Sequence, residues 1–398
     1  MICSGLPKFP FSRLLFASIL TCSITAAGAQ VTPVATGLNN PRGLLFGPDD
    51  TLYVAEAGLG AGNGFGGVGT GVGLTGSIGK IEHLESHHPE YERIVTGLSS
   101  VADQHGVVGA DGLSQYDDGE LHFIMAESGL AEQLNYPNSS PTIFQQFGRL
   151  FAVSGDHHTP IAIAKVGNFD YKWSAANKNA PFAPVGQFPD ANPYAVLSVP
   201  GYDYIADAGS NTIDEVDSTG KVRIVAYVPN PTLTMGSKTV TISDAVPTCI
   251  AKGDDGYLYV GTLAFGAFYA SHTPQSKIYR VDPKLSNALL NGEDVWASGF
   301  NPITGCGFSH HAFYVTEFIT AASGGMTGDV VRISLTDDGA AGKRKAFGVG
   351  KLVTPNGFAA GEDGAIYVSN FSVFPGVNSG PTGQVVRINT DTDDQDEH

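Results

Sequence analysis

The sequence is poor in cationic side chains. Its 398 residues include 22 Lys and Arg against 39 Asp and Glu, which gives a formal net charge of −17 at pH 7. Because nucleic acids and anionic membranes are bound mainly through Lys and Arg, this composition disfavours both as partners. Five acidic residues fall within the last eight positions, and we expect residues 391–398 to form a solvated, disordered tail.

The sequence also lacks the short motifs that mark common active sites. It contains no GxSxG, HExxH or Walker sequence and no CxxC pair or Cys/His zinc spacing. A GxGxxG-like spacing occurs within residues 58–79, but no strand and helix of a βαβ unit flank it, so a flexible loop is expected there. Any chemistry would therefore come from residues that lie apart in the sequence.

Helical periodicity is absent beyond the N-terminus, while 51 Gly and 23 Pro favour strands and turns. One phrase is instead repeated six times, as two apolar runs around a tight turn, most often rich in Asp and Gly, which is typical of a β-hairpin. The copies are Pro41–Glu56, Ala110–Glu127, Pro193–Asp207, Pro247–Thr262, Pro302–Glu317 and Pro355–Asn370. The last four begin 53 to 55 residues apart, a period in the range expected of propeller blades.

A third alternating strand follows each hairpin, and a fourth follows some of them, as at Glu92–Thr96 and Val222–Ala226. The sixth copy lacks a fourth strand, whereas Val31–Leu38 precedes the first copy and resembles the outer strand of the first blade. Pairing Val31–Leu38 into the last blade would close the ring and hide two sheet edges. The sequence therefore predicts an all-β, six-bladed β-propeller with four-stranded blades, spanning residues 30–390 as one domain.

The first 29 residues have the pattern of a secretory signal peptide. A weak basic start is followed by an apolar run too short for a membrane span and by a small-x-small cleavage sequence near Ala29–Gln30. A lipoprotein signal using Cys22 is an alternative, although the residues before Cys22 match a lipid-attachment sequence poorly. We expect an exported protein, periplasmic or extracellular.

Export makes the remaining cysteines informative. Only Cys249 and Cys306 follow the predicted cleavage point, in the innermost strands of the fourth and fifth blades. They sit one step apart in their repeats. Both a disulfide and a pair of buried small apolar residues stay open.

Aligning the six copies gives two rings of residues beside the central channel. The first ring, at the start of each inner strand, is Arg42, Asp111, Tyr194, Thr248, Thr304 and Asn356. The second ring, at the end of each second strand, is Glu56, Glu127, Asp207, Thr262, Glu317 and Asn370. An acidic, amide-lined mouth can hold a hard cation or set carboxylates of different pKa beside a substrate. The same residues can instead cap neighbouring turns, a role that repetition favours.

The stretch Val34–Asp49, together with Leu52–Gly58, the Gly-rich loop that follows it and Arg93–Ser100, resembles the ScyD/ScyE family of exported propeller proteins. More distantly, the blades are similar to NHL repeats and to the gluconolactonase and strictosidine-synthase propellers. Lactonase relatives bind a divalent metal in the channel through Glu and Asn ligands. Glu56, Asn356 and Asn370 compare loosely with those ligands, but the flanking motifs differ and the site is not transferred.

Two functions follow as hypotheses. The first is a non-catalytic module, expected to be monomeric, that binds a small ligand or a protein partner through the channel mouth, with Arg42, Glu56, Asp111, Glu127, Tyr194, Asp207, Glu317, Asn356 and Asn370 as candidate ligand-binding residues. The alternative is a metal-assisted hydrolase or lactonase, or a lyase, at the same mouth. A divalent cation such as Ca²⁺ is the cofactor that suits these oxygen ligands, with Glu56, Glu127, Asp207 and Glu317 as candidate metal ligands.

Overall fold

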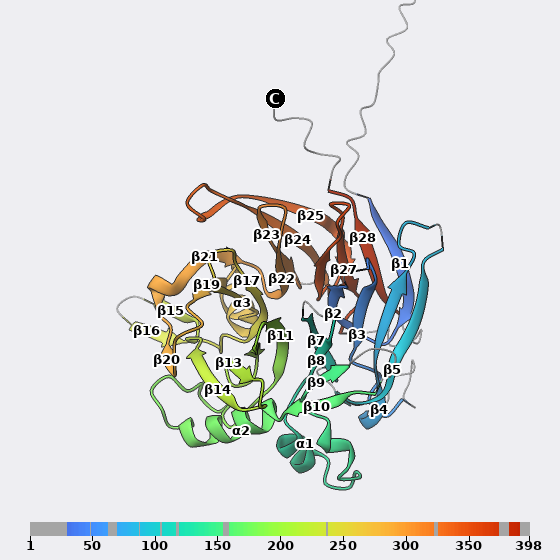
Figure 1. Cartoon of the computed structure of the whole chain (residues 1–398). Coiled ribbons are helices and arrows are strands. Elements are labelled where there is room, and N and C mark those ends of the chain that lie inside the picture. Colours follow the sequence, from blue (N-terminus) through green and yellow to red (C-terminus); the bar gives the residue numbers. More distant parts are fainter. Residues whose placement is uncertain are drawn as a thin grey trace, which may run out of the picture.

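Six sheets of four or five strands are arranged around one central axis in the computed structural model (Figure 1). The structure describes residues 30–47, 49–62, 70–86, 88–103, 106–116, 119–153, 159–235, 238–321, 325–373 and 382–390. The predicted signal peptide and the predicted acidic tail lie outside these residues. Each sheet contains a run of four antiparallel strands, which confirms the predicted six-bladed propeller.

The first three blades follow the chain in order from the axis outward. Blade 1 consists of β2 (Pro41–Phe46), β3 (Leu52–Glu56), β4 (Gly71–Glu82) and β5 (Glu90–Asp103), with β6 (Gly106–Val108) at its edge. Blade 2 consists of β7 (Ala110–Gln115), β8 (Leu121–Met125), β9 (Leu150–Val153) and β10 (Ile161–Ala164). Blade 3 consists of β11 (Pro193–Val199), β12 (Tyr202–Asp207), β13 (Thr212–Asp217) and β14 (Val222–Tyr227), with β20 (Ala288–Leu289) alongside.

The other three blades repeat the same order, except at the last outer strand. Blade 4 consists of β17 (Pro247–Lys252), β18 (Leu258–Thr262), β19 (Ser276–Val281) and β21 (Val295–Phe300). Blade 5 consists of β22 (Ile303–Ser309), β23 (Ala312–Glu317), β24 (Thr327–Leu335) and β25 (Ala341–Val353). Blade 6 consists of β26 (Phe358–Ala360), β27 (Ile366–Asn370), β28 (Gly383–Ile388) and, from the other end of the chain, β1 (Val31–Leu38).

The N-terminal strand completes the last blade, as the sequence predicts. Strand β1 pairs antiparallel with β28 from Val31 opposite Ile388 to Leu38 opposite Gly383. The blue and red strands therefore lie side by side in Figure 1. This pairing covers the edge of β28 and joins the two ends of the domain in one sheet.

Apolar side chains fill each interface between neighbouring blades. In β3, Leu52 and Val54 pack towards blade 6, whereas Ala55, the residue after Val54, packs towards blade 2. Successive residues of a strand point to opposite faces, so an inner strand covered on both sides reads as apolar throughout. Each fully buried Val, Leu or Ile side chain contributes about 1.5–3 kcal/mol relative to exposure.

Crowding at the axis explains why the residue after each first-ring position is small. A Cβ at Gly43 would lie 2.5 Å from the Asp111 carbonyl oxygen, and one at Gly357 would lie 2.2 Å from the Arg42 carbonyl oxygen. Both distances are far below van der Waals contact. The repeat keeps a small residue there because adjacent inner strands almost touch.

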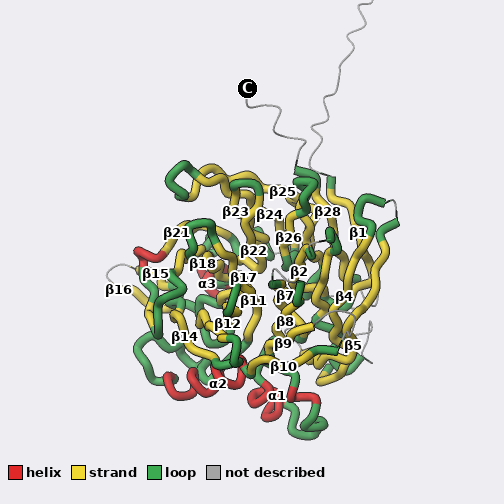
Figure 2. The backbone as a smooth tube through the Cα atoms, viewed as in Figure 1, coloured by secondary structure: helices red, strands yellow, loops and turns green. Residues whose placement is uncertain are grey.

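Among the described residues, three α-helices and one hairpin lie outside the repeat, and the sequence analysis did not predict them. They are α1 (Gly129–Asn135), α2 (Val166–Asn177), α3 (Phe265–Ser271) and the hairpin of β15 (Thr232–Met235) with β16 (Lys238–Thr241). Figure 2 shows α1 and α2 at the rim of blades 2 and 3. Trp173 of α2 contacts the rings of Phe182, Phe188 and Tyr227. None of the helices in the described ranges is long and apolar enough to cross a membrane.

A disulfide joins blades 4 and 5. Cys249 in β17 and Cys306 in β22 are bonded, with their Cα atoms 5.6 Å apart. The offset between the two cysteines in their repeats therefore does not prevent bonding, because β17 and β22 are adjacent inner strands. This result decides between the two alternatives that the sequence left open.

Replacing both cysteines by serine is expected to lower the free energy of unfolding by about 2–4 kcal/mol, since the bridge restricts a long loop of the unfolded chain. Denaturant unfolding of Cys249→Ser/Cys306→Ser against the oxidised wild type measures the effect. Wild-type protein kept in reductant is the control and should show a similar loss. Equal stability of the three samples would contradict a stabilising bridge.

His122 of blade 2 forms a hydrogen bond with blade 3 near the hairpin turns. The His122 Nδ1 lies 2.9 Å from the Asp203 Oδ1, and its Nε2 lies 3.0 Å from the Glu120 Oε1. The Ser198 hydroxyl also donates to the Asp203 Oδ1, at 2.6 Å. Burial lowers the pKa of His122, but the hydrogen bonds and charges of Asp203 and Glu120 outweigh burial and raise it overall.

Because the folded pKa of His122 is raised, its contribution to stability is complete below its unfolded pKa of about 6.5. It is lost as the pH rises through the folded pKa. We expect His122→Gln to be less stable than wild type by about 1.5–3 kcal/mol at pH 6 and by less at pH 9. Urea unfolding of both proteins across this range tests the prediction, and a difference independent of pH would refute it.

Candidate functional site

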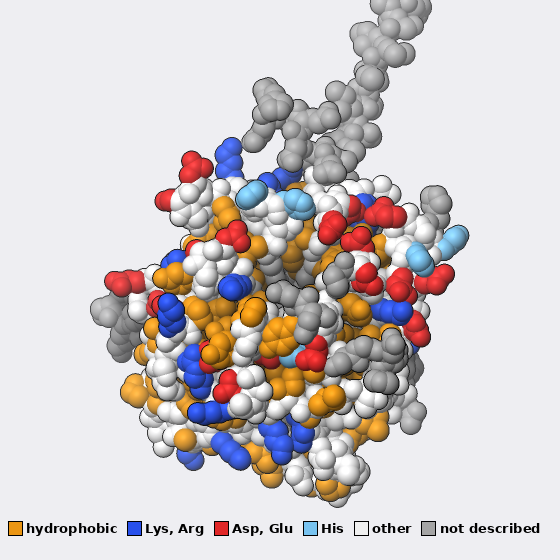
Figure 3. Space-filling view, viewed as in Figure 1, with side chains coloured by type: hydrophobic (Ala, Val, Ile, Leu, Met, Phe, Trp, Pro, Cys, Tyr) orange, Lys and Arg blue, Asp and Glu red, His pale blue; other side chains and the backbone are white. Residues whose placement is uncertain are grey.

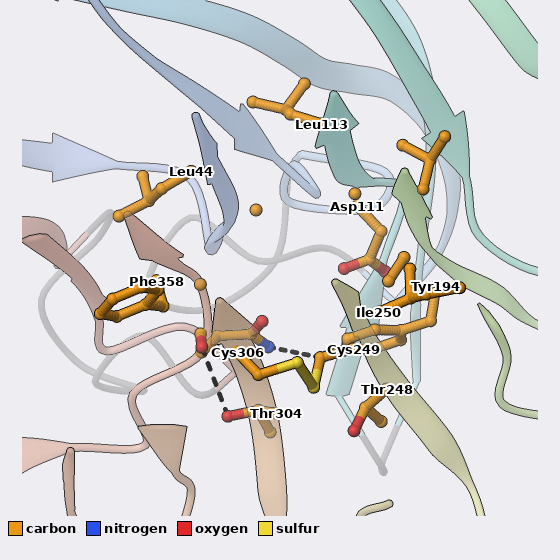
Figure 4. A pocket seen from close by; sticks show the side chains of 17 residues that line it. Leu44, Asp111, Leu113, Tyr194, Thr248, Cys249, Ile250, Thr304, Cys306 and Phe358 are labelled. Carbon is orange, nitrogen blue, oxygen red and sulfur yellow. Dashed lines mark hydrogen bonds between the residues drawn. A yellow bond between two sulfur atoms is a disulfide. The ribbon is translucent and has the colours of Figure 1, made fainter. Parts of the chain in front are cut away.

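Five of the six first-ring residues line a cavity in the central channel. They are Asp111, Tyr194, Thr248, Thr304 and Asn356, and the cavity has a volume of about 80 Å³. Figure 4 shows Asp111, Tyr194, Thr248 and Thr304 around this space, beside the Cys249–Cys306 disulfide. At about 30 Å³ per water molecule, the cavity is too small for an organic substrate.

Arg42, the sixth member, lines a larger pocket at the channel mouth instead. Its guanidinium donates to the Tyr194 hydroxyl at 3.2 Å and to the Val107 carbonyl oxygen at 2.5 Å. The Asn356 amide donates to the same Tyr194 hydroxyl at 2.5 Å. Three blades are therefore connected by hydrogen bonds that converge on one tyrosine.

Asp111 is the member without a hydrogen-bond partner. Its side chain is buried, and neither carboxyl oxygen has a partner within the described part of the chain. Burial raises the pKa of Asp111 to about 7, although the nearby charge of Arg42 acts in the opposite direction. At neutral pH this carboxyl group is thus divided between its neutral and charged forms.

Four second-ring residues serve as caps between blades. Each accepts a hydrogen bond from a backbone N–H in the linker that enters the inner strand of its own blade or, for Asn370, from the residue just before that linker. The pairs are Asn39 to Glu56 at 2.5 Å, Asn192 to Asp207 at 2.8 Å, Asn301 to Glu317 at 2.9 Å and Val353 to Asn370 at 2.7 Å. The structural alternative therefore explains the recurrence of these four residues.

Glu56 is the most heavily engaged of these caps. Arg93 donates to both of its carboxylate oxygens, at 2.7 and 2.8 Å, and the hydroxyls of Ser77 and Tyr91 also donate to it. Bidentate Arg–carboxylate pairs are strong and geometrically specific. Glu56 is thus fully engaged within blade 1.

Two second-ring residues do not cap a linker. Thr262 accepts instead from the Lys277 N–H of its own blade, at 3.1 Å, whereas Glu127 lines a pocket of about 560 Å³ at the channel mouth. This mouth pocket is lined by Arg42, Val101, Asp103, Gly106, Val107, Val108, Glu127, Glu132, Asn135, Tyr136 and Val373. It lies where the second strands end, between the extended hairpin of β5 and β6, helix α1 and the segment after β27.

The mouth pocket concentrates carboxyl groups that are poorly solvated. Glu132 of α1 is 4% exposed, and its Oε1 accepts from Asn135 at 3.1 Å while its Oε2 has no partner among the residues described. Burial, together with the charges of Asp190, Glu132 and Asp207, raises the pKa of Glu127 well above its ordinary value. Burial also raises the pKa of Glu132, against the hydrogen bond from Asn135.

A second acidic depression lies at the hairpin turns of blades 1 and 6. Its carboxyl groups are those of Asp49, Asp50, Glu82, Glu85, Glu362 and Asp363, and Figure 3 shows acidic side chains gathered near β1 and β28. Glu82 pairs with Lys80 at 2.8 Å and Asp363 with Arg387 at 2.5 Å. In the ranges that the structure covers, no carboxylate oxygen of this depression is both buried and without a partner. Both the mouth pocket and this depression therefore contain several carboxyl groups. Of the two, only the mouth pocket contains, among the described residues, a carboxyl oxygen that is buried without a partner, the Glu132 Oε2.

The four candidate metal ligands do not meet at one point. Glu56, Asp207 and Glu317 cap different blades, and only Glu127 faces the mouth pocket. Within the described ranges, no three His, Cys, Asp or Glu side chains are arranged as a metal ion requires.

Sequence reasoning identified Arg42 and Glu127 but missed the rest of the pocket wall. Glu132, Asn135 and Tyr136 belong to an insertion between β8 and β9; blade 4 has a helix at the corresponding place, α3, with a different sequence. Aligning the copies therefore gives no signal for them. The one available signal is the insertion itself, which follows directly after a second-ring acid.

Comparison with known proteins identifies the fold alone. No family model matches the sequence, and no curated protein matches it. A PQQ-bound aldose sugar dehydrogenase from Streptomyces coelicolor is 14% identical, with a TM-score of 0.52 over 91% of this chain and 98% of that one. A putative oxidoreductase (glucose dehydrogenase) from Thermus thermophilus is 13% identical, with a TM-score of 0.52 over 91% and 100%. At these identities the similarity does not extend to an activity.

A cluster of three buried aspartates lies beside the mouth. Asp170 of α2 meets Asp207 and Asp214, all three fully buried, and four of their oxygens have no donor among the described residues: both of Asp170, Asp207 Oδ2 and Asp214 Oδ1. Burial and the charges of Asp214 and Asp207 raise the pKa of Asp170 well above its usual value. A proton shared between two of these carboxyl groups can act as the hydrogen-bond donor that their oxygens otherwise lack.

Because the pKa of Asp170 is raised in the folded protein, its carboxyl group contributes most to stability below its unfolded pKa of about 4. That contribution is lost as the pH rises through the folded pKa. An asparagine amide would donate to both neighbours without ionising. We expect Asp170→Asn to be more stable than wild type at pH 8 by about 1–3 kcal/mol, measured by urea unfolding. Asp254→Asn, an exposed change in the hairpin turn of blade 4, is the control; a less stable Asp170→Asn protein at pH 8 would contradict proton sharing.

Proposed function

We propose that this protein binds a small polar ligand in the mouth pocket. The observation that supports the proposal is that Glu127 and Glu132 line one pocket and that the Glu132 Oε2 is buried there without a donor from the described residues. Unpartnered buried polar groups are destabilising, so the position of this oxygen in a ligand-sized pocket favours a role in binding. The pocket volume of about 560 Å³ lies in the range typical of small-molecule sites.

A small ligand fits better than a protein partner at this position. The pocket is concave, and its polar groups converge from β5, α1 and the start of β2. Protein interfaces are broad patches with aromatic anchors, whereas few convergent polar groups in an apolar hollow are typical of ligand sites. The proposal keeps two further predictions from the sequence. The N-terminal pattern supports export of the mature chain, which we expect to be monomeric. The resemblance of Val34–Asp49 supports membership of the ScyD/ScyE family.

A second candidate is an enzyme at the same pocket, a hydrolase, lactonase or lyase that uses acid–base groups. The observation that favours it is the raised pKa of Glu127, because a carboxyl group with a raised pKa keeps its proton to higher pH and is better suited to act as a general acid. Asp111 lines the channel cavity rather than the mouth pocket. Glu127 is therefore the residue for which we propose that role.

The test of ligand binding starts from the ligand-free protein. Glu127→Gln and Glu132→Gln each remove a carboxyl group whose ionisation burial disfavours, and the amide oxygen in Glu132→Gln can still accept from Asn135. Each variant is therefore expected to be more stable than wild type by about 1 kcal/mol. Thermal and urea unfolding measure this difference. Glu56→Gln, which removes a fully engaged cap, is the contrast and is expected to lose about 2–4 kcal/mol.

The second arm uses a panel of probes: glucose, gluconolactone, glycerol, putrescine and CaCl2. Binding at a hundred times the Kd adds about 2.7 kcal/mol of stability, so a bound probe raises the Tm of wild type by several degrees. The same probe should lose this effect in Glu132→Gln and keep it in Glu293→Gln, an exposed change on blade 4. Destabilised Gln variants, or a probe effect that survives in Glu132→Gln, would overturn the mouth pocket as the site.

A further inference from the structure

We propose that the ligand of the mouth pocket is a small organic dication, a diamine whose ammonium groups are held by the carboxylates of Glu127, Glu132 and Asp103. This inference rests on the proposed ligand-binding function and names the chemical class of the ligand. Three features of the pocket support it: the charges, the apolar residues of the lining, and a carboxyl oxygen that has no donor among the described residues.

Negative charge dominates the wall of the pocket. Asp103, Glu127 and Glu132 line it directly, and the charges of Asp190 and Asp207 act on Glu127 from behind the wall. A hollow lined by charges of one sign focuses its field on the opening and concentrates ions of the opposite sign. The pocket therefore attracts cations and repels carboxylate or phosphate ligands.

Arg42 does not cancel this field. Its guanidinium donates to the Tyr194 hydroxyl and the Val107 carbonyl oxygen and lies near the Asp111 carboxyl group. Its nearest opposite charge is thus Asp111 on the channel side, away from the carboxyl groups of the wall. Among the described residues that line the mouth pocket, Arg42 is the single cationic one.

Beside Asn135, the remaining lining includes apolar residues that suit a hydrocarbon spacer. Val101, Val107, Val108 and Val373 contribute methyl groups, and Tyr136 adds an aromatic ring. A neutral polyol would bury hydroxyl groups against these valines without partners, at a cost in free energy. The methylene chain of a diamine has no such groups, and an ammonium group is also attracted to the face of a tyrosine ring.

Ammonium groups fit the acceptors better than a bare metal ion does. Three carboxyl groups line the pocket, yet no His, Cys, Asp or Glu triplet within the described ranges has the arrangement that a metal ion needs. Each ammonium carries three N–H donors and can bridge acceptors spread over a wider space. Two such groups match the partnerless Glu132 Oε2 and the Glu127 carboxyl group with one charge each.

Binding of a dication would also displace protons. The pKa values of Glu127 and Glu132 are raised by burial, and the charges of Asp190, Asp207 and Asp103 raise that of Glu127 further. A nearby positive charge favours the ionised form and lowers both pKa values. Diamine binding near pH 7 is therefore accompanied by proton release, a signature that a neutral ligand does not produce.

Isothermal titration of the full mature chain at pH 7 tests this inference with four probes: putrescine, n-butylamine, butane-1,4-diol and CaCl2. The first three have matched carbon chains and differ in the number of charges. We expect putrescine to bind at least tenfold more tightly than each of the others. Titrations in two buffers of different ionisation enthalpy should show proton release with putrescine.

Variants separate the pocket from general attraction to an acidic protein. Glu127→Gln and Glu132→Gln should each weaken putrescine binding at least tenfold, whereas the exposed change Glu293→Gln should leave it unchanged. Equal weakening in all three variants would indicate non-specific attraction and overturn the inference. Tighter binding of Ca²⁺ than of putrescine would also overturn it, in favour of a metal ion.

The inference and the function it rests on fail in different ways. If butane-1,4-diol or a sugar binds in a manner that depends on Glu132 and putrescine does not, the pocket is a ligand site but the dication is wrong. If Glu127→Gln and Glu132→Gln alter neither the binding of any probe nor the stability of the free protein, the ligand-binding function itself fails.

Discussion

The antiparallel pairing of β1 with β28 is the contact on which the rest of the structure depends. It places both ends of the domain in one sheet and closes six blades into a ring. An open arc would leave a strand edge of blade 6 exposed and would let the inner strands diverge. Closure holds them around a narrow axis, so that Gly43 and Gly357 almost touch the backbone of the next inner strand. The channel is therefore a packed core with little free space, and larger ligands are limited to its mouth.

Closure also determines the role of the second ring. Each blade has to meet the linker from the blade before it, and a carboxylate or amide at the end of the second strand accepts an N–H from that linker or from the residue just before it. Glu317 and Asn370 do so in neighbouring blades with different chemistry and similar distances, 2.9 and 2.7 Å. At blade 2 this arrangement changes, because α1 follows β8 directly and Glu127 adopts a left-handed φ of 64°. Its side chain is thereby released from the capping role and lines the mouth pocket.

The architecture could be predicted from the sequence because blades repeat, and repeated packing leaves a repeated pattern. Even the closing strand could be identified, since Val31–Leu38 resembles the outer strand of blade 1. The disulfide could not be decided, because the two cysteines are offset within their repeats. Helix α2 was missed because its buried residues, Asp170 and Ser174 among them, give no apolar stripe. The candidate site was predicted only in part: alignment of the copies found Glu127, but it contains no information on Glu132 and Tyr136, which occur in a single blade.

Acidic residues in this protein therefore have three different physical roles, which composition alone does not separate. Asp363 on the hairpin-turn face is paired and solvated, Glu56 is buried with a donor for each carboxylate oxygen, and Glu132 is buried with one oxygen unmatched. Of the three, only the buried carboxyl group with an unmatched oxygen lowers stability without a compensating contact in the described part of the fold. Natural proteins accept such a cost mainly where function requires it. The unmatched oxygen of Glu132, at the same pocket as the uncapped Glu127, is therefore a stronger indication of a site than the whole acidic excess of the chain.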